Sequence, residues 1–113
     1  MQPQDTDINT EWVKIQLMLR KKFGEVPDLQ SVLFIIGLQE LGMNHQVLKR
    51  EQKIDLIHVG ICTVLTPFGY YKKLGLDDEG WPHFKCIKKL PQDLVGEQQN
   101  VFMKKAIITY LNQ

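Results

Sequence analysis

The stretch from Val32 to Leu38 reads Val-Leu-Phe-Ile-Ile-Gly-Leu and contains no polar side chain. Its flanking residues favour a helix, so this helix carries apolar side chains on every side. Such a helix must be enclosed by the rest of the chain or by a second copy of it. The stretch therefore constrains architecture and partners far more than it constrains chemistry.

Four segments of the chain carry apolar side chains at helical spacing, and helix-breaking residues separate them. Gly24, Gly42 and Pro67 end three of the segments. With 113 residues, 43% of them hydrophobic, the whole chain is predicted to form one mainly α domain, at the margin of the α+β class. Residues 1–8 are expected as a flexible tail and residues 43–50 as a polar connection. The predicted helices run from Asn9 or Thr10 to Phe23, from Pro27 to about Leu41, from about Glu51 to Leu65, and from Leu94 or Glu97 to the C-terminus.

Three of these helices have a set of apolar side chains that we expect to be buried. Spacings of three and four residues place most of each set on one face of its helix. The sets are Ile8, Trp12, Ile15, Leu19 and Phe23 in the first helix, Ile54, Ile57, Ile61, Val64 and Leu65 in the third, and Val101, Phe102, Ile108 and Leu111 in the fourth.

Gly37 and Gly60 each interrupt a strongly apolar helical stretch. A glycine in the middle of a helix costs up to about 1 kcal/mol relative to alanine. Close crossing of the second and third helices, with their backbones in contact at these glycines, would offset that cost. The alternative is that each glycine only avoids a clash with a bulky neighbour.

Between Pro67 and Pro91 the spacing changes to that of a β-hairpin with strands over residues 70–76 and 81–90. Asp77 and Gly80 suit a type I turn closed by a glycine bulge. The face that carries Tyr71, Trp81 and His83 is either a recognition surface or is covered by the fourth helix. We favour the second alternative, in which the fourth helix packs over this face. The expected pairs are Asp77 with Trp81, Leu76 with Pro82, Leu74 with Phe84, Lys72 with Cys86 and Lys73 with Lys85, so that Leu74, Leu76, Phe84 and Cys86 face the core.

His58 and Cys62 are one helical turn apart, and His83 and Cys86 follow in the predicted hairpin. Two pairs of such ligands are what a structural zinc site requires. Their order matches none of the common zinc-finger spacings, however, and His83 and Cys86 fall on opposite faces of a strand. Core residues are the favoured interpretation, so neither a metal nor a cofactor is predicted. A metal- or small-ligand-binding module that uses all four residues is the second hypothesis.

Asp55, His58 and Cys62 recur at intervals of about one turn, so a helix could group them as a nucleophile with its base. Their surroundings are apolar, however, and burial raises the pKa of a thiol. An interior helix position also lacks the free amides that would stabilise an oxyanion. The acidic residues 77–79 lie at a solvated hairpin tip. No catalytic residue is predicted, and the chain is interpreted as a non-enzymatic protein.

The hairpin mixes aromatic side chains with five lysines, the combination that single-stranded nucleic acid binds. The acidic turn offsets three of these charges, and part of the aromatic set is needed for the core. Nucleic-acid binding is therefore the third hypothesis. The residues concerned are Tyr70, Tyr71, Trp81 and Phe84 with Lys72, Lys73, Lys85, Lys88 and Lys89.

The location predicted from the sequence is the cytoplasm. The first residues have neither the basic nor the apolar region of a signal peptide, and the longest apolar run is far shorter than the ~20 residues that span a bilayer. Two cysteines are also fewer than a disulfide-stapled secreted domain carries. No membrane partner is expected.

The chain resembles a small family of uncharacterised bacterial proteins of about this length. The resemblance covers nearly the whole chain and implies no activity, cofactor or functional residue. It is carried by the strings Pro27-Asp28-Leu29, Leu38-Gln39-Glu40-Leu41-Gly42, Asp55-Leu56-Ile57-His58 and Gly80-Trp81-Pro82-His83.

Protein–protein association is the function that the sequence favours. The second helix is too apolar for a chain this short to surround easily, so we expect it to be buried, with the third helix, partly in a homodimer or against another protein. The residues expected at the interaction surface are Phe34, Ile35, Leu38, Tyr71, Trp81 and His83.

Overall fold

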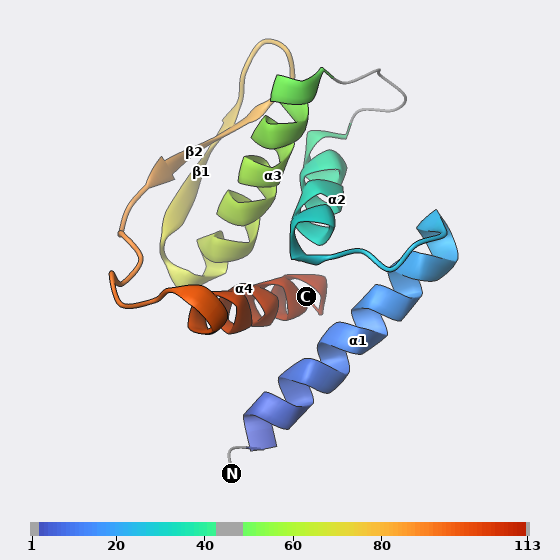
Figure 1. Ribbon diagram of the computed structural model, residues 1–113. Helices are drawn as coiled ribbons and strands as arrows, with labels where there is room; N and C mark the ends of the chain where they lie inside the picture. The colour runs from blue at the N-terminus through green and yellow to red at the C-terminus, as the bar shows by residue number, and fades with distance from the viewer. Residues whose placement is uncertain (1–2, 43–48, 113) are drawn as a thin grey trace.

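The computed structural model describes residues 3–42 and 49–112, which form four helices with a two-stranded antiparallel hairpin between the third and fourth (Figure 1). The predicted mainly α architecture is therefore confirmed. Most of the predicted polar connection, residues 43–48, lies outside the described residues. The elements are α1 (Pro3–Phe23), α2 (Leu29–Leu41), α3 (Arg50–Leu65), the short 3-10 helix η1 (Thr66–Phe68), β1 (Tyr71–Leu76), β2 (Pro82–Cys86) and α4 (Gly96–Leu111).

Local sequence signals set most helix ends. The Asp28 carboxylate accepts a hydrogen bond from the Ser31 amide at 2.8 Å and so caps α2, and this bond lowers the pKa of Asp28. Gly42 adopts the left-handed conformation that ends α2. The predicted start of α1 is wrong, because this helix begins at Pro3 and covers most of the expected tail. Proline is well suited to the first turn of a helix, where its missing amide has no partner to lose.

The predicted contact between the second and third helices occurs at both glycines. A Cβ atom on Gly37 would collide with the backbone carbonyl of Leu56, and one on Gly60 would collide with that of Leu33. Each helix thus presents a leucine and, four residues later, a glycine, and the two pairs meet reciprocally. The nearest atoms at each glycine belong to the backbone of the other helix and cannot move aside as a side chain could. The crossing therefore depends on the absence of a side chain at both positions.

Three helices and part of α3 build one apolar core. The central residues are fully or almost fully buried: Trp12, Ile15 and Leu19 of α1, Val32, Leu33 and Ile36 of α2, Val64 and Leu65 of α3, and Met103, Ala106 and Ile107 of α4. Trp12, Ile15 and Leu19 of the stripe predicted for α1 are buried, whereas Ile8 is only partly buried and Phe23 is 54% exposed. The predicted set on α3 is shifted, since Ile54 is 62% exposed while Leu56 faces α2.

The set predicted for α4 is also displaced. Val101, Phe102, Ile108 and Leu111 are only partly buried and surround the buried positions instead of occupying them. Phe102 contacts the rings of Phe68 and Tyr70, at centroid distances of 5.8 and 5.9 Å.

The hairpin forms where predicted, but its register is not the predicted one. Leu76 pairs with Pro82 as expected, and then the register shifts between Lys73 and Gly75. Gly75 has φ +126°, a conformation that glycine adopts freely, and Leu74 has no partner across the ladder. As a result Lys73 lies opposite Phe84 instead of Lys85. The predicted core face is wrong, because Leu74, Leu76 and Cys86 are exposed.

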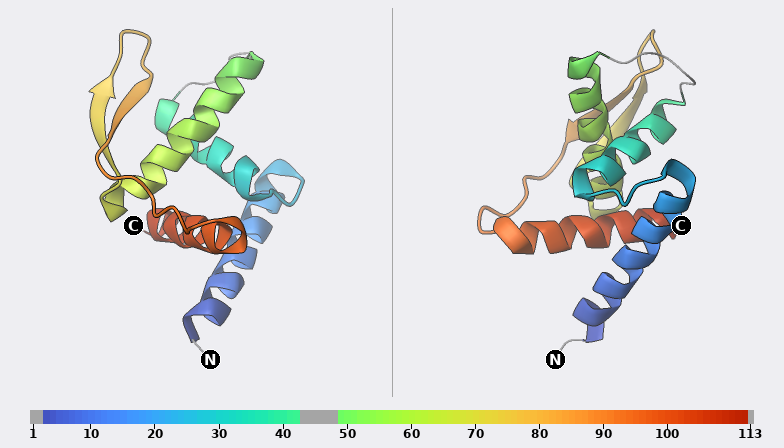
Figure 2. Two further views of the ribbon diagram at one scale, coloured as in Figure 1. Left: turned by 60° about the vertical axis from the view of Figure 1, so that its left-hand side comes forward. Right: turned by 45° about the vertical axis from the view of Figure 1, so that its right-hand side comes forward.

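The hairpin lies beside α3, and α1 runs along the outside of the molecule (Figure 2). The predicted cover by the fourth helix is wrong, because it is α3 that packs against both strands. α1 packs mainly against α4, and its N-terminal end projects away from the remaining elements in all views (Figures 1 and 2).

Candidate functional site

A pocket of about 350 Å³ lies between α3 and the hairpin. It brings together three of the four residues of the metal-site hypothesis, His58, Cys62 and His83, while Cys86 is not part of its lining. The α3 wall and the hairpin wall face each other across the opening. The complete lining is Asp55, His58, Val59 and Cys62 from α3 and Asp77, Trp81, Pro82, His83 and Phe84 from the hairpin and its turn.

On the α3 wall, the Cys62 sulfur lies 3.5 Å from Nε2 of His58, one turn earlier on the helix. The Cys62 side chain is almost completely buried, and burial, with a smaller effect of Cys86, raises its pKa to about 11. The His58 ring also meets the ring of Tyr71 edge to face, with centroids 6.5 Å apart. The thiol therefore stays protonated near neutral pH. This wall has the residues of a nucleophile and base but not the activated thiolate that such chemistry uses.

On the hairpin wall, Asp77 organises the turn. Its Oδ1 accepts hydrogen bonds from the amides of Glu79 and Trp81, both at 2.9 Å. Its Oδ2 lies 2.9 Å from Nε2 of His83, which must donate because a carboxylate can only accept. The hydrogen bond from His83, more than the bonds from the two amides, lowers the pKa of Asp77. One carboxylate thus places both Trp81 and His83 at the pocket.

These contacts do not form a metal centre. Among residues 3–42 and 49–112, no group of three or more His, Cys, Asp or Glu side chains could hold a metal ion. His58 pairs with Cys62, and His83 pairs with Asp77. The Cys86 thiol donates to the Lys88 carbonyl at 3.6 Å. The four residues of the zinc hypothesis therefore do not converge on one point.

The six residues expected at the interaction surface do not form one surface. Phe34, Ile35 and Leu38 are partly buried on α2, and Phe34 lines a second groove with Ile57. Trp81 and His83 line the pocket beside α3. Val32, Leu33, Ile36 and Leu41 are buried within this one chain, so the argument that α2 needs a second copy to cover it is weaker than predicted.

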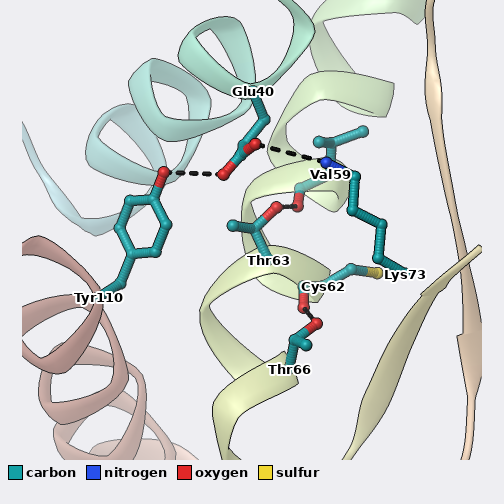
Figure 3. Close-up of polar contacts among 7 residues, drawn as sticks. All are labelled: Glu40, Val59, Cys62, Thr63, Thr66, Lys73 and Tyr110. Carbon is teal, nitrogen blue, oxygen red and sulfur yellow. Dashed lines mark hydrogen bonds and ion pairs between the residues drawn. The ribbon is translucent and has the colours of Figure 1, made fainter. Parts of the chain in front are cut away.

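A polar junction that sequence reasoning missed connects α2, β1 and α4 (Figure 3). The Tyr110 hydroxyl donates to Oε1 of Glu40 at 2.9 Å, and Nζ of Lys73 lies 3.8 Å from Oε2 of the same carboxylate. Burial, and then the bond to Glu40, raises the pKa of Tyr110 to about 12. Thr63 and Thr66 line the adjoining cavity of about 200 Å³.

The junction has no local signature in the sequence, because Tyr110 and Glu40 are 70 positions apart. An isolated carboxylate near the end of a strongly apolar helix was the only available signal. The raised pKa of Tyr110 makes its hydroxyl a poor acid, so the junction fixes three elements relative to one another and offers no acid–base chemistry.

Comparisons with protein-family models, with curated proteins and with solved structures found no match. The resemblance to uncharacterised bacterial proteins therefore stays a prediction.

Part of the basic and aromatic set of the hairpin is engaged within the chain, while Lys72, Lys85 and Lys89 are exposed. Lys73 pairs with Glu40, and Lys88 lies over the ring of Tyr70, 5.3 Å from its centroid. Tyr70 and Tyr71 pack against the core. Nothing in this arrangement favours nucleic acid over the other hypotheses. In the part of the chain that the structure describes, no helix is long and apolar enough to cross a membrane.

Proposed function

We propose that this chain acts through protein–protein association and that its partner is a second copy, bound at the outer face of α1. The observation that supports this most directly is the distribution of exposed apolar side chains. Of the ten large ones in the described residues, five lie between positions 13 and 26. They are Val13, Leu17, Met18, Phe23 and Val26, each about half exposed. Val13 and Leu17 belong to the outer face of α1, whereas Phe23 lies on the side of Trp12 and Leu19, and Val26 follows the end of the helix.

The outer face of α1 lies opposite its buried stripe. Trp12, Ile15 and Leu19 face the core, and at 100° per residue Leu17 points to the other side of the helix, with Val13 one turn before it. An amphipathic helix that only covers a core would carry polar side chains at these two positions.

The area of the molecule also supports a dimer. The chain exposes 8037 Å², whereas a compact monomer of 13.2 kDa exposes about 6,400 Å². A standard interface removes about 800 Å² from each partner. The surplus is thus large enough for one such interface.

Charge favours an antiparallel pair of α1 helices over a parallel one. Acidic residues occupy the first half of α1 and the basic cluster Arg20-Lys21-Lys22 its last turn. If Val13 of one copy lies opposite Leu17 of the other, the basic last turn of each copy lies beside the first half of the other copy. In a parallel pair the two basic clusters would lie side by side and repel each other.

The compartment that fits this proposal is the cytoplasm. Cys62 and Cys86 are both free thiols, as a reducing compartment maintains them. The proposal requires no cofactor and no reaction.

Size-exclusion chromatography with light scattering tests the proposal. We expect a mass of twice 13.2 kDa for the wild-type chain and the monomer mass for Leu17→Glu. Leu74→Glu is the matched control, because Leu74 is an equally apolar side chain, 61% exposed on the hairpin. It should remain dimeric.

A monomeric wild type, or a dimer that Leu74→Glu dissociates and Leu17→Glu does not, would contradict the proposal.

A further inference from the structure

The pocket between α3 and the hairpin has an uneven charge. Asp55 and Asp77 line it from opposite walls, and its lining includes neither lysine nor arginine. Three acceptor positions of Asp77 are already used by His83 and two backbone amides, so Asp55 supplies the less engaged carboxylate. A ligand with a negative charge would meet repulsion from both sides.

The rest of the lining combines His58, Cys62 and His83 with apolar and aromatic side chains. Val59, Pro82 and Phe84 provide hydrocarbon surface, and the partly buried Trp81 provides an indole. Aromatic rings, and tryptophan above all, attract cations that approach their face within about 6 Å. A carboxylate, an indole and an apolar surface around one opening are the parts from which amine-binding sites are built.

The size of the pocket limits the ligand. Ligand sites range from about 300 to 1,000 Å³, and this pocket of about 350 Å³ lies at the lower end. That space accommodates a short chain with one charged group. It is larger than an ion needs, and the side chains do not converge as metal ligands do.

We propose that this pocket binds a small organic cation, an alkylammonium or alkylguanidinium, with its charge at Asp55 and Trp81 and its hydrocarbon part against Val59, Pro82 and Phe84. The site lies on α3 and the hairpin and does not involve the outer face of α1, so it stands or falls independently of the proposed dimer.

The chain contains its own internal control for a binding experiment. It has two tryptophans, and their indole N–H groups give separate signals in a ¹H–¹⁵N spectrum. Trp81 lines the pocket, whereas Trp12 is 5% exposed in the core. Titration with butylammonium should shift the Trp81 signal saturably and leave the Trp12 signal in place. 1-Butanol and butyrate have the same chain length without the positive charge, and neither should cause this shift at the same concentration.

Two matched variants distinguish binding at this pocket from attraction of a cation to the overall negative charge nearby. Asp55→Asn should weaken binding of butylammonium about fivefold, the size expected for loss of a partly solvated ion pair. Asp78→Asn removes an equal charge beside the turn but outside the lining, and it should leave the dissociation constant unchanged. Both side chains are exposed, so both variants should keep the wild-type spectrum.

Three results would overturn the inference. The first is no saturable shift of Trp81 at millimolar butylammonium. The second is an equal shift with 1-butanol, which would leave only an apolar slot. The third is an equal weakening by Asp78→Asn, which would leave only the negative potential of the hairpin tip. A shift confined to the cations and weakened by Asp55→Asn alone would establish the site.

Discussion

The α2–α3 pair and the hairpin are built on opposite principles. In the helix pair, Gly37 and Gly60 sit against main chain, and a single added carbon at either position has nowhere to go. In the hairpin, Gly75 has open space around it, and Leu74 and Leu76 are exposed. The backbone contact at the two glycines fixes the helix pair. The hairpin is held against the helices by a few side-chain contacts, such as those of Tyr71 with His58 and of Lys73 with Glu40.

The largest expected effect comes from the helix pair. Gly37→Ala should lower the free energy of unfolding by about 3 kcal/mol, because the new Cβ must push α3 away from α2. In an ordinary helix the same substitution stabilises by up to about 1 kcal/mol, so even the sign of the change is diagnostic. Urea unfolding followed by circular dichroism measures it.

Gly24→Ala is the control for this measurement. Gly24 has no neighbour within 4 Å of an added Cβ, but its φ is +88°. Gly24→Ala should therefore lower the free energy of unfolding by about 1 kcal/mol, through backbone strain alone. Gly60→Ala should behave like Gly37→Ala. A stabilised Gly37→Ala would mean that the two helices do not touch.

This contrast explains how much of the fold the sequence predicts. The two mid-helix glycines, the helix stop at Gly42 and the break at Pro67 are local signals with few structural solutions, and the structure has all of them. The hairpin register depends instead on where a bulge falls. The sequence offers Gly80 and Gly75 for that purpose, and the register shifts next to Gly75 in the structure.

The pocket was predictable only in part. Helical periodicity places Asp55, His58 and Cys62 together, and the turn motif places Asp77 near Trp81. The two groups face each other across one opening because the hairpin packs against α3. We had expected the fourth helix, not α3, to cover this face of the hairpin. The junction of Glu40 with Tyr110 depends on tertiary packing entirely.

The second largest effect is the pH dependence of stability, which compares Cys62 of the α2–α3 pair with Cys86 of the hairpin. The pKa of Cys62 is about 11 in the folded chain, against 9.0 for a free thiol. Between pH 9 and pH 11 the unfolded chain loses this proton while the folded chain keeps it. The free energy of unfolding therefore falls as the pH rises, by about 2 kcal/mol at pH 11.

Urea titrations from pH 7 to pH 11 measure this decline. Cys62→Ala should remove its part of the slope, and Cys86→Ala, at the exposed cysteine of the hairpin, should keep it. Tyr110, whose pKa is also raised, contributes equally in both variants. The pKa of Tyr71 is raised mainly by burial and to a smaller extent by each cysteine, so either variant removes only a small part of its contribution. Equal slopes in the two variants would show that the Cys62 thiol is not buried when the chain is folded.

The smallest effect tests the hairpin register. Leu74→Ala and Leu76→Ala should each change the free energy of unfolding by less than about 0.5 kcal/mol, because both side chains are more than 60% exposed. The same substitution at Leu56, which is completely buried against α2, should cost about 3 kcal/mol. In the regular register that the sequence favours, Leu74 would face the core, and its substitution would cost several times more. Leu76 pairs with Pro82 in both registers and serves as the control. Only the bulge at Gly75 distinguishes the two registers, so a large loss of unfolding free energy in Leu74→Ala would mean that the bulge lies elsewhere. Two small losses would mean that the contact between α2 and α3 contributes far more to stability than the hairpin does.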